Sequence, residues 1–229
     1  MASAQLNSFL ENLITPERKE KFDRVINLRT NHFTVATEDV YQLHNTSAVI
    51  RSCDVFGVQN IHVIEERNRR KIDREIAMGA QKWVSLNRHH SSRECIAHLR
   101  EKGYQIVATI PHGKASNPGN FNIEKPSAFF FGTEQDGLSA DVINEADEFL
   151  QIPMVGFTES LNISVSAAII LQQLTQRLRQ SDVQWELSEN EKTTLKYDWL
   201  SKSFKNFPEI LKRFQDNVYF PIFIPPKEI

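Results

Sequence analysis

The sequence predicts an α/β protein with a parallel sheet covered by helices on both faces. Predicted strands alternate with predicted helices, and the strands are continuous apolar runs rather than alternating polar and apolar positions. The chain has 229 residues, of which 40% are hydrophobic. This length suits one α/β domain with appendages or two small domains.

Helix caps and apolar runs locate the individual elements. The first helix begins at Thr15, because a capping hydroxyl is followed by proline and an acid. Ser91 and Ser139 suit the starts of two later helices, and Ser160 or Asn162 suits the start of a long one. Helices are expected over residues 15–29, 45–56, 94–102 and from 163 onward, and strands over 33–38, 61–64, 83–86, 105–110, 127–131 and near 149–154.

Composition narrows the class of protein. The net charge of −2 means that any nucleic-acid affinity must come from local basic patches. The two cysteines, Cys53 and Cys95, have no CxxC spacing, so we expect a reducing cytosol and predict no metal site. Because no signal-peptide pattern or apolar run of about 20 residues occurs, we expect a soluble, cytoplasmic protein.

Basic and aromatic residues near the two ends allow two interpretations. The bases of the first helix, which include Arg18 and Arg24, either form a solvated face or contact RNA. A further basic segment covers residues 67–74. Aromatic residues alternate with lysines after residue 196. They could stack on nucleotides, but packing of a terminal helix onto its own domain is the favoured interpretation.

The stretch from Gln151 to Ala168 carries the strongest local signal for a site. It delivers polar side chains to the start of a helix, where unpaired N–H groups can hold an anionic or carbonyl-bearing ligand. A well-capped helix after a strand explains the same residues. The sequence contains no GxGxxG after the first strand, no P-loop, no GxSxG and no HExxH. These absences disfavour dinucleotide, phosphate-loop, hydrolase and zinc-protease chemistry.

Three segments in order resemble the three motifs of the SpoU/TrmH-type SPOUT RNA 2′-O-methyltransferases. They are LHNTSAVIRSCDVFGVQNIHVIE, FFFGTEQDGLS and IPMVGFTESLNISVSAA, and the resemblance covers residues 15 to about 180. One departure is Leu43, where the tRNA-modifying members usually carry proline. The resemblance implies a C-terminal trefoil knot, which general topology rules would exclude. It also implies a homodimer, S-adenosylmethionine as the cofactor, and methylation of guanosine 18 in the tRNA D-loop.

The same resemblance assigns roles to individual residues. The expected catalytic group is Arg51, Asn45, Glu134 and Asn162, with Arg51 as a clamp on phosphate and ribose rather than a base, because a free guanidinium has a pKa above about 12. Asn45 and Arg51, six residues apart on one helix, are expected to point roughly the same way. The expected cofactor contacts are Thr109, Gly132, Ile152, Leu161, Ser160 and Ser164, and the expected RNA contacts are Arg18, Arg24, Arg177 and Arg179.

The expected organisation is an N-terminal helical arm over residues 1–30, a methyltransferase domain over 31–180 and a helical, aromatic extension over 181–229. Subunits are expected to pair along the helix from Ile163, through Ser164, Ala167, Ala168 and Leu171. Two other functions stay open. One is the same chemistry on ribosomal or other RNA, which the motifs cannot separate from tRNA. The other is an RNA-binding module without catalysis, which the intact polar set disfavours.

Overall fold

The computed structural model describes residues 4–40, 43–65, 79–133 and 135–219. Within it the chain forms two compact units, one of residues 28–186 and one that joins residues 1–27 with 187–229. The basic segment over residues 67–74 and the predicted catalytic Glu134 lie outside the described residues.

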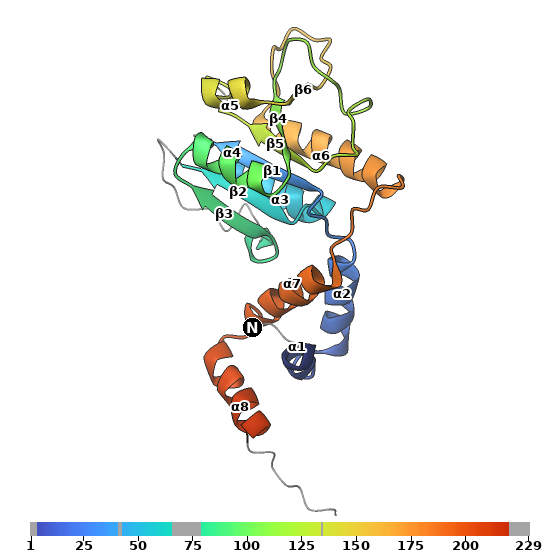
Figure 1. The fold of residues 1–229 in the computed structure, drawn as a ribbon, viewed down its shortest axis with the longest axis vertical. Coiled ribbons are helices and arrows are strands. Elements are labelled where there is room, and N and C mark those ends of the chain that lie inside the picture. Colours follow the sequence, from blue (N-terminus) through green and yellow to red (C-terminus); the bar gives the residue numbers. More distant parts are fainter. Residues whose placement is uncertain (1–3, 41–42, 66–78, 134, 220–229) are drawn as a thin grey trace, which may run out of the picture. The chain divides into compact units, whose positions relative to one another are not determined.

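The larger unit is built on a six-stranded parallel sheet, which confirms the predicted fold class (Figure 1). The strand order is β3-β2-β1-β5-β4-β6, and every pairing between neighbours is parallel. The strands are β1 Phe33–Glu38, β2 Asn60–Ile64, β3 Ser85–His89, β4 Gln105–Thr109, β5 Ser127–Phe131 and β6 Glu148–Leu150. Because all strands are parallel, their carboxyl ends meet at one edge of the sheet, where open α/β proteins bind ligands.

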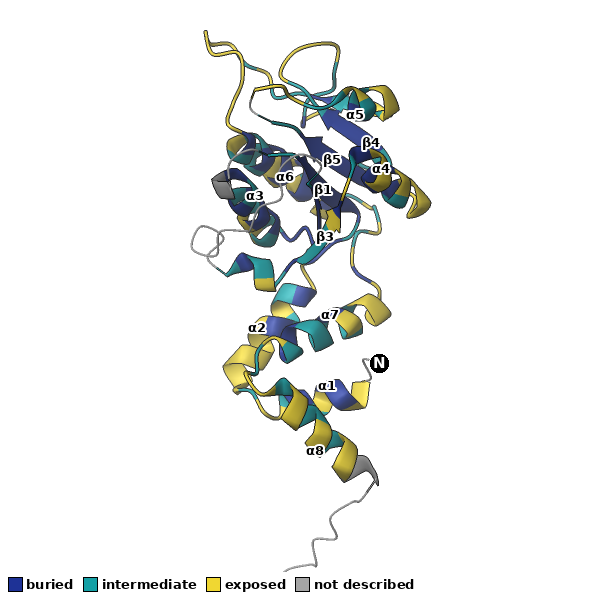
Figure 2. Ribbon diagram, turned by 90° about the vertical axis from the view of Figure 1, so that its left-hand side faces the viewer, coloured by how far each residue is buried: buried dark blue, intermediate teal, exposed yellow. Residues whose placement is uncertain are grey.

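Helices cover both faces of this sheet, as Figure 2 shows by the burial of the strands between them. Helices α3 (Leu43–Phe56) and α6 (Ile163–Arg179) pack on one face, and α4 (Ser92–Glu101) and α5 (Ala140–Glu145) on the other. Strand β5 serves both cores, because Phe129 belongs to the first cluster and Phe130 to the second. This two-sided burial explains why the strands read as continuous apolar runs.

Two predicted strands were misplaced. The segment expected as a strand at 83–86 begins as a turn after the short helix η1 (Ala80–Lys82), because the Trp83 amide donates to the Ala80 carbonyl oxygen at 2.8 Å. Strand β3 therefore starts only at Ser85. The last strand ends at Leu150, since the Gln151 amide next bonds the Ser116 carbonyl oxygen at 2.9 Å rather than a neighbouring strand.

The caps predicted from sequence are present. The hydroxyl of Ser91 accepts from the Glu94 amide at 3.2 Å, and that of Ser139 accepts from the Val142 amide at 3.4 Å. The Glu94 carboxylate does not complete a capping box with the Ser91 amide. It accepts instead from the His90 amide at 2.8 Å. Gly57 ends α3 with φ +80, and an added Cβ would lie 2.5 Å from the Leu28 carbonyl oxygen, so only glycine fits there.

The smaller unit consists of helices from both ends of the chain. They are α1 (Ala4–Glu11), α2 (Pro16–Ile26), α7 (Glu189–Ser201) and α8 (Phe207–Tyr219), of which α1 had not been predicted. The Trp199 ring on α7 is buried against Phe22 on α2, with ring centroids 5.7 Å apart. The Lys196 ammonium lies 2.5 Å from a carboxylate oxygen of Glu11 on α1. Packing of the tail aromatics onto their own domain is thereby confirmed for Trp199.

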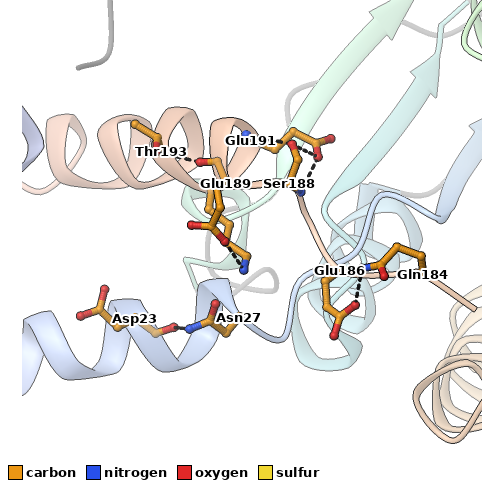
Figure 3. Close-up of polar contacts among 9 residues, drawn as sticks. Asp23, Asn27, Gln184, Glu186, Ser188, Glu189, Glu191 and Thr193 are labelled. Carbon is orange, nitrogen blue, oxygen red and sulfur yellow. Dashed lines mark hydrogen bonds and ion pairs between the residues drawn. The ribbon is translucent and has the colours of Figure 1, made fainter. Parts of the chain in front are cut away.

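Side-chain hydrogen bonds stabilise the start of α7 and the end of α2 in this unit (Figure 3). At the start of α7, the Ser188 hydroxyl accepts from the Glu191 amide at 3.3 Å, and the Glu191 carboxylate accepts from the Ser188 amide at 2.8 Å. At the end of α2, the Asn27 side chain donates to the Asp23 carbonyl oxygen at 3.0 Å. These bonds fix where both helices begin and end.

Within the described ranges, none of the helices combines the length and the apolar character that crossing a bilayer requires.

Candidate active site

An amide pair joins the starts of the two helices on one face of the sheet. Asn162 is the N-cap of α6, and its side-chain oxygen accepts from the Ser164 amide at 2.8 Å and from the Ser164 hydroxyl at 2.6 Å. Its side-chain nitrogen donates to the side-chain oxygen of Asn45 at 3.1 Å. Asn45 lies in the first turn of α3 and is buried. Two helix N-termini, each with partial positive charge, are therefore held side by side.

Arg51 does not point the same way as Asn45, so that expectation was wrong. Arg51 is exposed, whereas the side chain of Asn45 is 6% exposed. The reason is helix geometry, because six residues advance about 240° around an α-helix and leave the two side chains roughly 120° apart. Arg51 instead shares the exposed surface of α3 with Val55, one turn later.

A cavity of about 530 Å³ opens at the carboxyl ends of β4, β5 and β6. This volume lies within the range of ordinary small-molecule sites, roughly 300–1,000 Å³. Its lining includes five of the six predicted cofactor positions, namely Thr109, Gly132, Ile152, Ser160 and Leu161. Sequence analysis had not assigned the other apolar walls, which include Ile110, Leu138, Ile143, Ile163 and Ile170.

The exception among the predicted cofactor positions is Ser164. It does not line the cavity, and both its amide and its hydroxyl bond the capping Asn162. The Thr109 hydroxyl is likewise engaged, since it donates to the Phe130 carbonyl oxygen at 2.7 Å. Neither hydroxyl is therefore free to donate to a ligand, and the polar side chains in the cavity wall are those of other residues, among them His112, Asp136 and Glu159.

The loop after β5 closes tightly on itself beside the cavity. The Thr133 amide donates to the Gly137 carbonyl oxygen at 2.9 Å, and the Gly137 amide returns to Thr133 at 3.1 Å. A Cβ on Gly132 would lie 2.1 Å from the Gly137 carbonyl oxygen. Residue 132 must be glycine because the backbone approaches too closely for any side chain.

A buried carboxylate that the sequence analysis missed braces the far end of this loop. Glu38, at the end of β1, is 5% exposed and accepts from the Ser139 amide at 2.7 Å and from the Ser139 hydroxyl at 2.6 Å. It also accepts from the Ser92 hydroxyl at the start of α4. The only sequence signal was an acid at the end of a buried strand. Glu38 is therefore a positioning residue for the loop that follows β5.

The four predicted RNA-contacting arginines have different surroundings. Arg177 donates to the Pro118 carbonyl oxygen at 2.6 Å and to that of Phe121 at 2.9 Å, so it braces the loop before β5. Arg179 donates to the Phe56 carbonyl oxygen at 2.7 Å, and burial lowers its pKa. Arg18 and Arg24 are exposed on α2, although Arg18 also donates to the Ser203 hydroxyl at 3.0 Å.

An open parallel sheet with a ligand-sized cavity at its carboxyl edge is the arrangement in which α/β proteins bind small molecules. The chain belongs to the SpoU rRNA methylase family, whose profile matches residues 32–172. It is 40% identical to the tRNA (guanosine(18)-2′-O)-methyltransferase of Borreliella burgdorferi over 198 residues, which are 86% of this chain and 91% of that protein. The family resemblance inferred from the three motifs is thereby confirmed.

Solved structures agree with this assignment. The crystal structure of the A. aeolicus TrmH/SpoU tRNA modifying enzyme has a TM-score of 0.73 at 29% identity, and the match covers 82% of this chain and 96% of that one. The AdoMet-bound rRNA methyltransferase from Sinorhizobium meliloti has a TM-score of 0.59 at 26% identity and covers 68% and 60% of the two chains.

Proposed function

We propose that this chain transfers a methyl group from S-adenosylmethionine to the ribose 2′-hydroxyl of guanosine 18 in tRNA. The observation that carries the proposal is the cavity at the carboxyl edge, with five predicted cofactor positions in its wall. The 40% identical relative, which is a tRNA (guanosine(18)-2′-O)-methyltransferase, supports the choice of RNA and nucleotide.

The cavity residues fit such a methyl donor. Ile152 and Leu161 supply apolar walls for a flat purine, and the Gly132 turn lets backbone groups approach a bound nucleoside closely. The donor supplies a methyl group already activated on a sulfonium, so the protein must chiefly position the acceptor. Positioning of this kind can be worth about 7–11 kcal/mol.

The polar residues nearby have distinct proposed roles. Asn162 and Asn45 hold the starts of α6 and α3 together, which fixes the helix dipoles beside the site. Arg51, exposed on α3, grips a substrate phosphate and ribose through its planar fork. The hydroxyl proton then leaves to that phosphate or to water. Glu134 is proposed to hold Asn45 or Arg51 in place.

The proposal includes a trefoil knot formed by the C-terminal part of the larger unit. Three contacts of the loop between β4 and β5 support it. The Ser116 amide donates to the Phe149 carbonyl oxygen at 2.9 Å, the Gln151 amide donates to Ser116 at 2.9 Å, and Arg177 of α6 bonds the carbonyl oxygens of Pro118 and Phe121. The chain that leaves β6 and the helix that follows are thus both tied to one loop.

We also propose a homodimer that pairs through α6 and the segment before it. The residues first chosen for the interface require correction, because Ala167 and Leu171 are fully buried in the subunit's own core. Exposed apolar side chains lie instead at Val155, Phe157, Leu161 and Val165. These are four of the seven large hydrophobic residues that the described chain exposes, and such concentration on one segment is typical of an interface.

The dimer predicts a particle of twice the 26.4 kDa chain mass in light scattering at micromolar concentration. Val165→Asp should convert it to a monomer, because it places a charge where an apolar surface is buried. Leu13→Asp is the matched control, since Leu13 is 48% and Val165 45% exposed. A monomeric wild-type protein would contradict the dimer.

RNA binding is proposed to use the exposed bases of α2. Replacing Arg18 and Arg24 by alanine together should weaken tRNA binding and lower the slope of log affinity against log salt by roughly 1.4–1.8, since each lost phosphate contact removes about 0.7–0.9. S-adenosylmethionine affinity should not change. Glu20→Ala, also exposed on α2, is the control that must not lower the slope. An unchanged slope in the double variant would mean that these arginines are only solvated.

The decisive test is methyl transfer from labelled S-adenosylmethionine to bulk tRNA and to ribosomal RNA, followed by nuclease mapping of the modified nucleotide. Label at guanosine 18 of tRNA is the expected result. Label confined to ribosomal RNA would mean that the chain catalyses the proposed reaction on ribosomal RNA instead of tRNA. RNA binding without any transfer would favour a non-catalytic module.

A further inference from the structure

Three histidines and a cysteine gather where α4 packs on strands β2 and β3, in the same unit as the cavity but without lining it. His62 lies on β2 and His89 on β3, while Cys95 and His98 stand three residues apart on α4. His62, His89 and Cys95 are all buried, with exposed fractions of 2%, 6% and 0%. The methyl-transfer proposal uses none of these side chains.

The donor atoms of this cluster lie close together. The Nδ1 of His62 and the Nε2 of His89 are 2.9 Å apart, and the ligand atoms of His62, His89 and Cys95 all lie within 4.8 Å of one another. The His98 ring centroid is 5.7 Å from that of His62 and 5.5 Å from that of His89. The ligand atoms of His62, His89 and Cys95 thus converge from two strands and one helix, and the His98 ring lies beside them.

The cluster is also short of hydrogen bonds. Among the described residues, the buried Nδ1 of His89 and the buried Nε2 of His98 have no hydrogen-bond partner. Buried polar atoms are nearly always bonded, and an exception often marks a site for a bound ion or water. The Nδ1 of His89 faces a carboxylate oxygen of Glu94 at 3.9 Å, so the Nε2 of His98 is the ring nitrogen of the cluster that these contacts leave unexplained.

We propose that His62, His89, Cys95 and His98 bind a Zn²⁺-class transition-metal ion in a closed structural site. Three imidazoles and one thiolate form the ligand set that such ions prefer, in the four-coordinate arrangement usual for structural zinc. In that arrangement ligand atoms are roughly 3.3 Å apart, given metal–nitrogen distances of about 2.0–2.1 Å. Side-chain rotations would bring the ligand atoms of His62, His89 and Cys95, now within 4.8 Å of one another, to that separation. Rotation of the neighbouring His98 ring would bring its nitrogen to the fourth position.

Binding has a definite proton balance. The ring proton now shared between His62 and His89 moves to the other nitrogen of its own ring, and the Cys95 thiol releases one proton as it becomes the thiolate ligand. Burial lowers the pKa of His62 to about 3, so this ring is already neutral. Burial raises the pKa of the Cys95 thiol, so the thiol is protonated and inert until a metal displaces its proton.

The surroundings supply an outer shell and a path for entry. With the Nε2 of His89 on the metal, its Nδ1 carries the proton and faces a carboxylate oxygen of Glu94 at 3.9 Å, the carboxylate–histidine arrangement common around zinc. Glu94 is exposed and His98 half-buried, so we expect an ion to enter from the side of these two residues. The exposed Lys102 at the end of α4 is the nearby positive charge.

The test is titration of the chelator-treated full chain with Co²⁺, followed by absorbance. One Co²⁺ per chain is expected, with visible bands of tetrahedral intensity and a thiolate charge-transfer band in the near ultraviolet, and Zn²⁺ should displace it. Zn²⁺ should also raise the melting temperature, because it binds only the folded chain. A chain that gives neither spectrum nor thermal shift would refute the site.

Substitutions assign the ligands. Cys95→Ser, which is nearly isosteric, should remove the charge-transfer band, and His89→Gln should weaken Co²⁺ binding at least about 100-fold, since outer-shell changes alone typically cost 10–100-fold. His90→Gln, at the exposed neighbouring histidine, is the matched control and should bind as wild type. Circular dichroism confirms folding, and Cys95→Ser decides the matter if His89→Gln fails to fold. A spectrum unchanged in Cys95→Ser, or lost in His90→Gln, would overturn the proposal.

Discussion

Arg51→Lys is expected to lower the single-turnover rate of methyl transfer by about 10²-fold or more, the loss typical of a missing positioning or acid–base group. Lysine keeps the positive charge but lacks the planar fork that can hold a phosphate and a hydroxyl together. Because Arg51 is exposed on α3, the substitution should leave the core intact. The loss should appear in turnover rather than in S-adenosylmethionine affinity.

The measurement uses saturating tRNA and cofactor, with circular dichroism to verify folding. Arg88→Lys is the matched control, because Arg88 is also exposed in the larger unit and pairs only with Glu65 among the ion pairs described. Near-native turnover in Arg51→Lys would mean that Arg51 supplies only charge. The catalytic role would then pass to Asn45 or Glu134.

Gly132→Ala is expected to abolish S-adenosylmethionine binding measurable by calorimetry. The new Cβ would lie 2.1 Å from the carbonyl oxygen of Gly137 and 2.4 Å from the amide nitrogen of Leu138, both of them backbone atoms. The loop that closes through the Thr133–Gly137 bonds must therefore open, and with it one wall of the cavity. Overpacking of this kind also costs about 1–3 kcal/mol of folding stability.

Gly156→Ala is the matched control, because it shows whether any glycine-to-alanine change in a loop reduces S-adenosylmethionine binding. The nearest atom to a Cβ at Gly156 is the Thr158 amide nitrogen at 4.0 Å, so alanine fits there without displacement. It should bind S-adenosylmethionine as wild type does. Calorimetry is performed well below each variant's melting temperature, so that a loss of affinity reflects the cofactor site and not unfolding of the chain. Wild-type affinity in Gly132→Ala would remove this loop from the proposed cofactor site.

The sequence was most informative where local chemistry decides the structure. Ser91 and Ser139 were placed correctly as helix caps, and the cap of α6 is Asn162, one of the two candidates with Ser160, because a cap depends on its own side chain and the next three residues. The strands buried on both faces were found for a similar reason, since continuous apolar runs need no knowledge of their neighbours. Five cavity positions came from the family resemblance rather than from periodicity.

Features that depend on distant partners could not be read from sequence. Arg177 looked like a free base on a helix, yet its guanidinium bonds two backbone carbonyls about 56 to 59 residues away in the chain. Ala167 and Leu171 looked suited to an interface, but both are buried in the core that α6 shares with α3 and the sheet. Glu38 gave no signal beyond its type, because Ser92 and Ser139 reach it only through the fold.

The smaller unit draws its helices from both ends of the chain, which sets the order of events during synthesis. Residues 1–27 leave the ribosome about 160 residues before residue 187 does. At 5–20 residues per second, that interval is roughly 10–30 s. During that interval Phe22 has no Trp199 ring to pack against, while the intervening sheet can already form. The first helices translated are therefore among the last to find their packing partners, and a growing chain carries their apolar faces uncovered in the meantime.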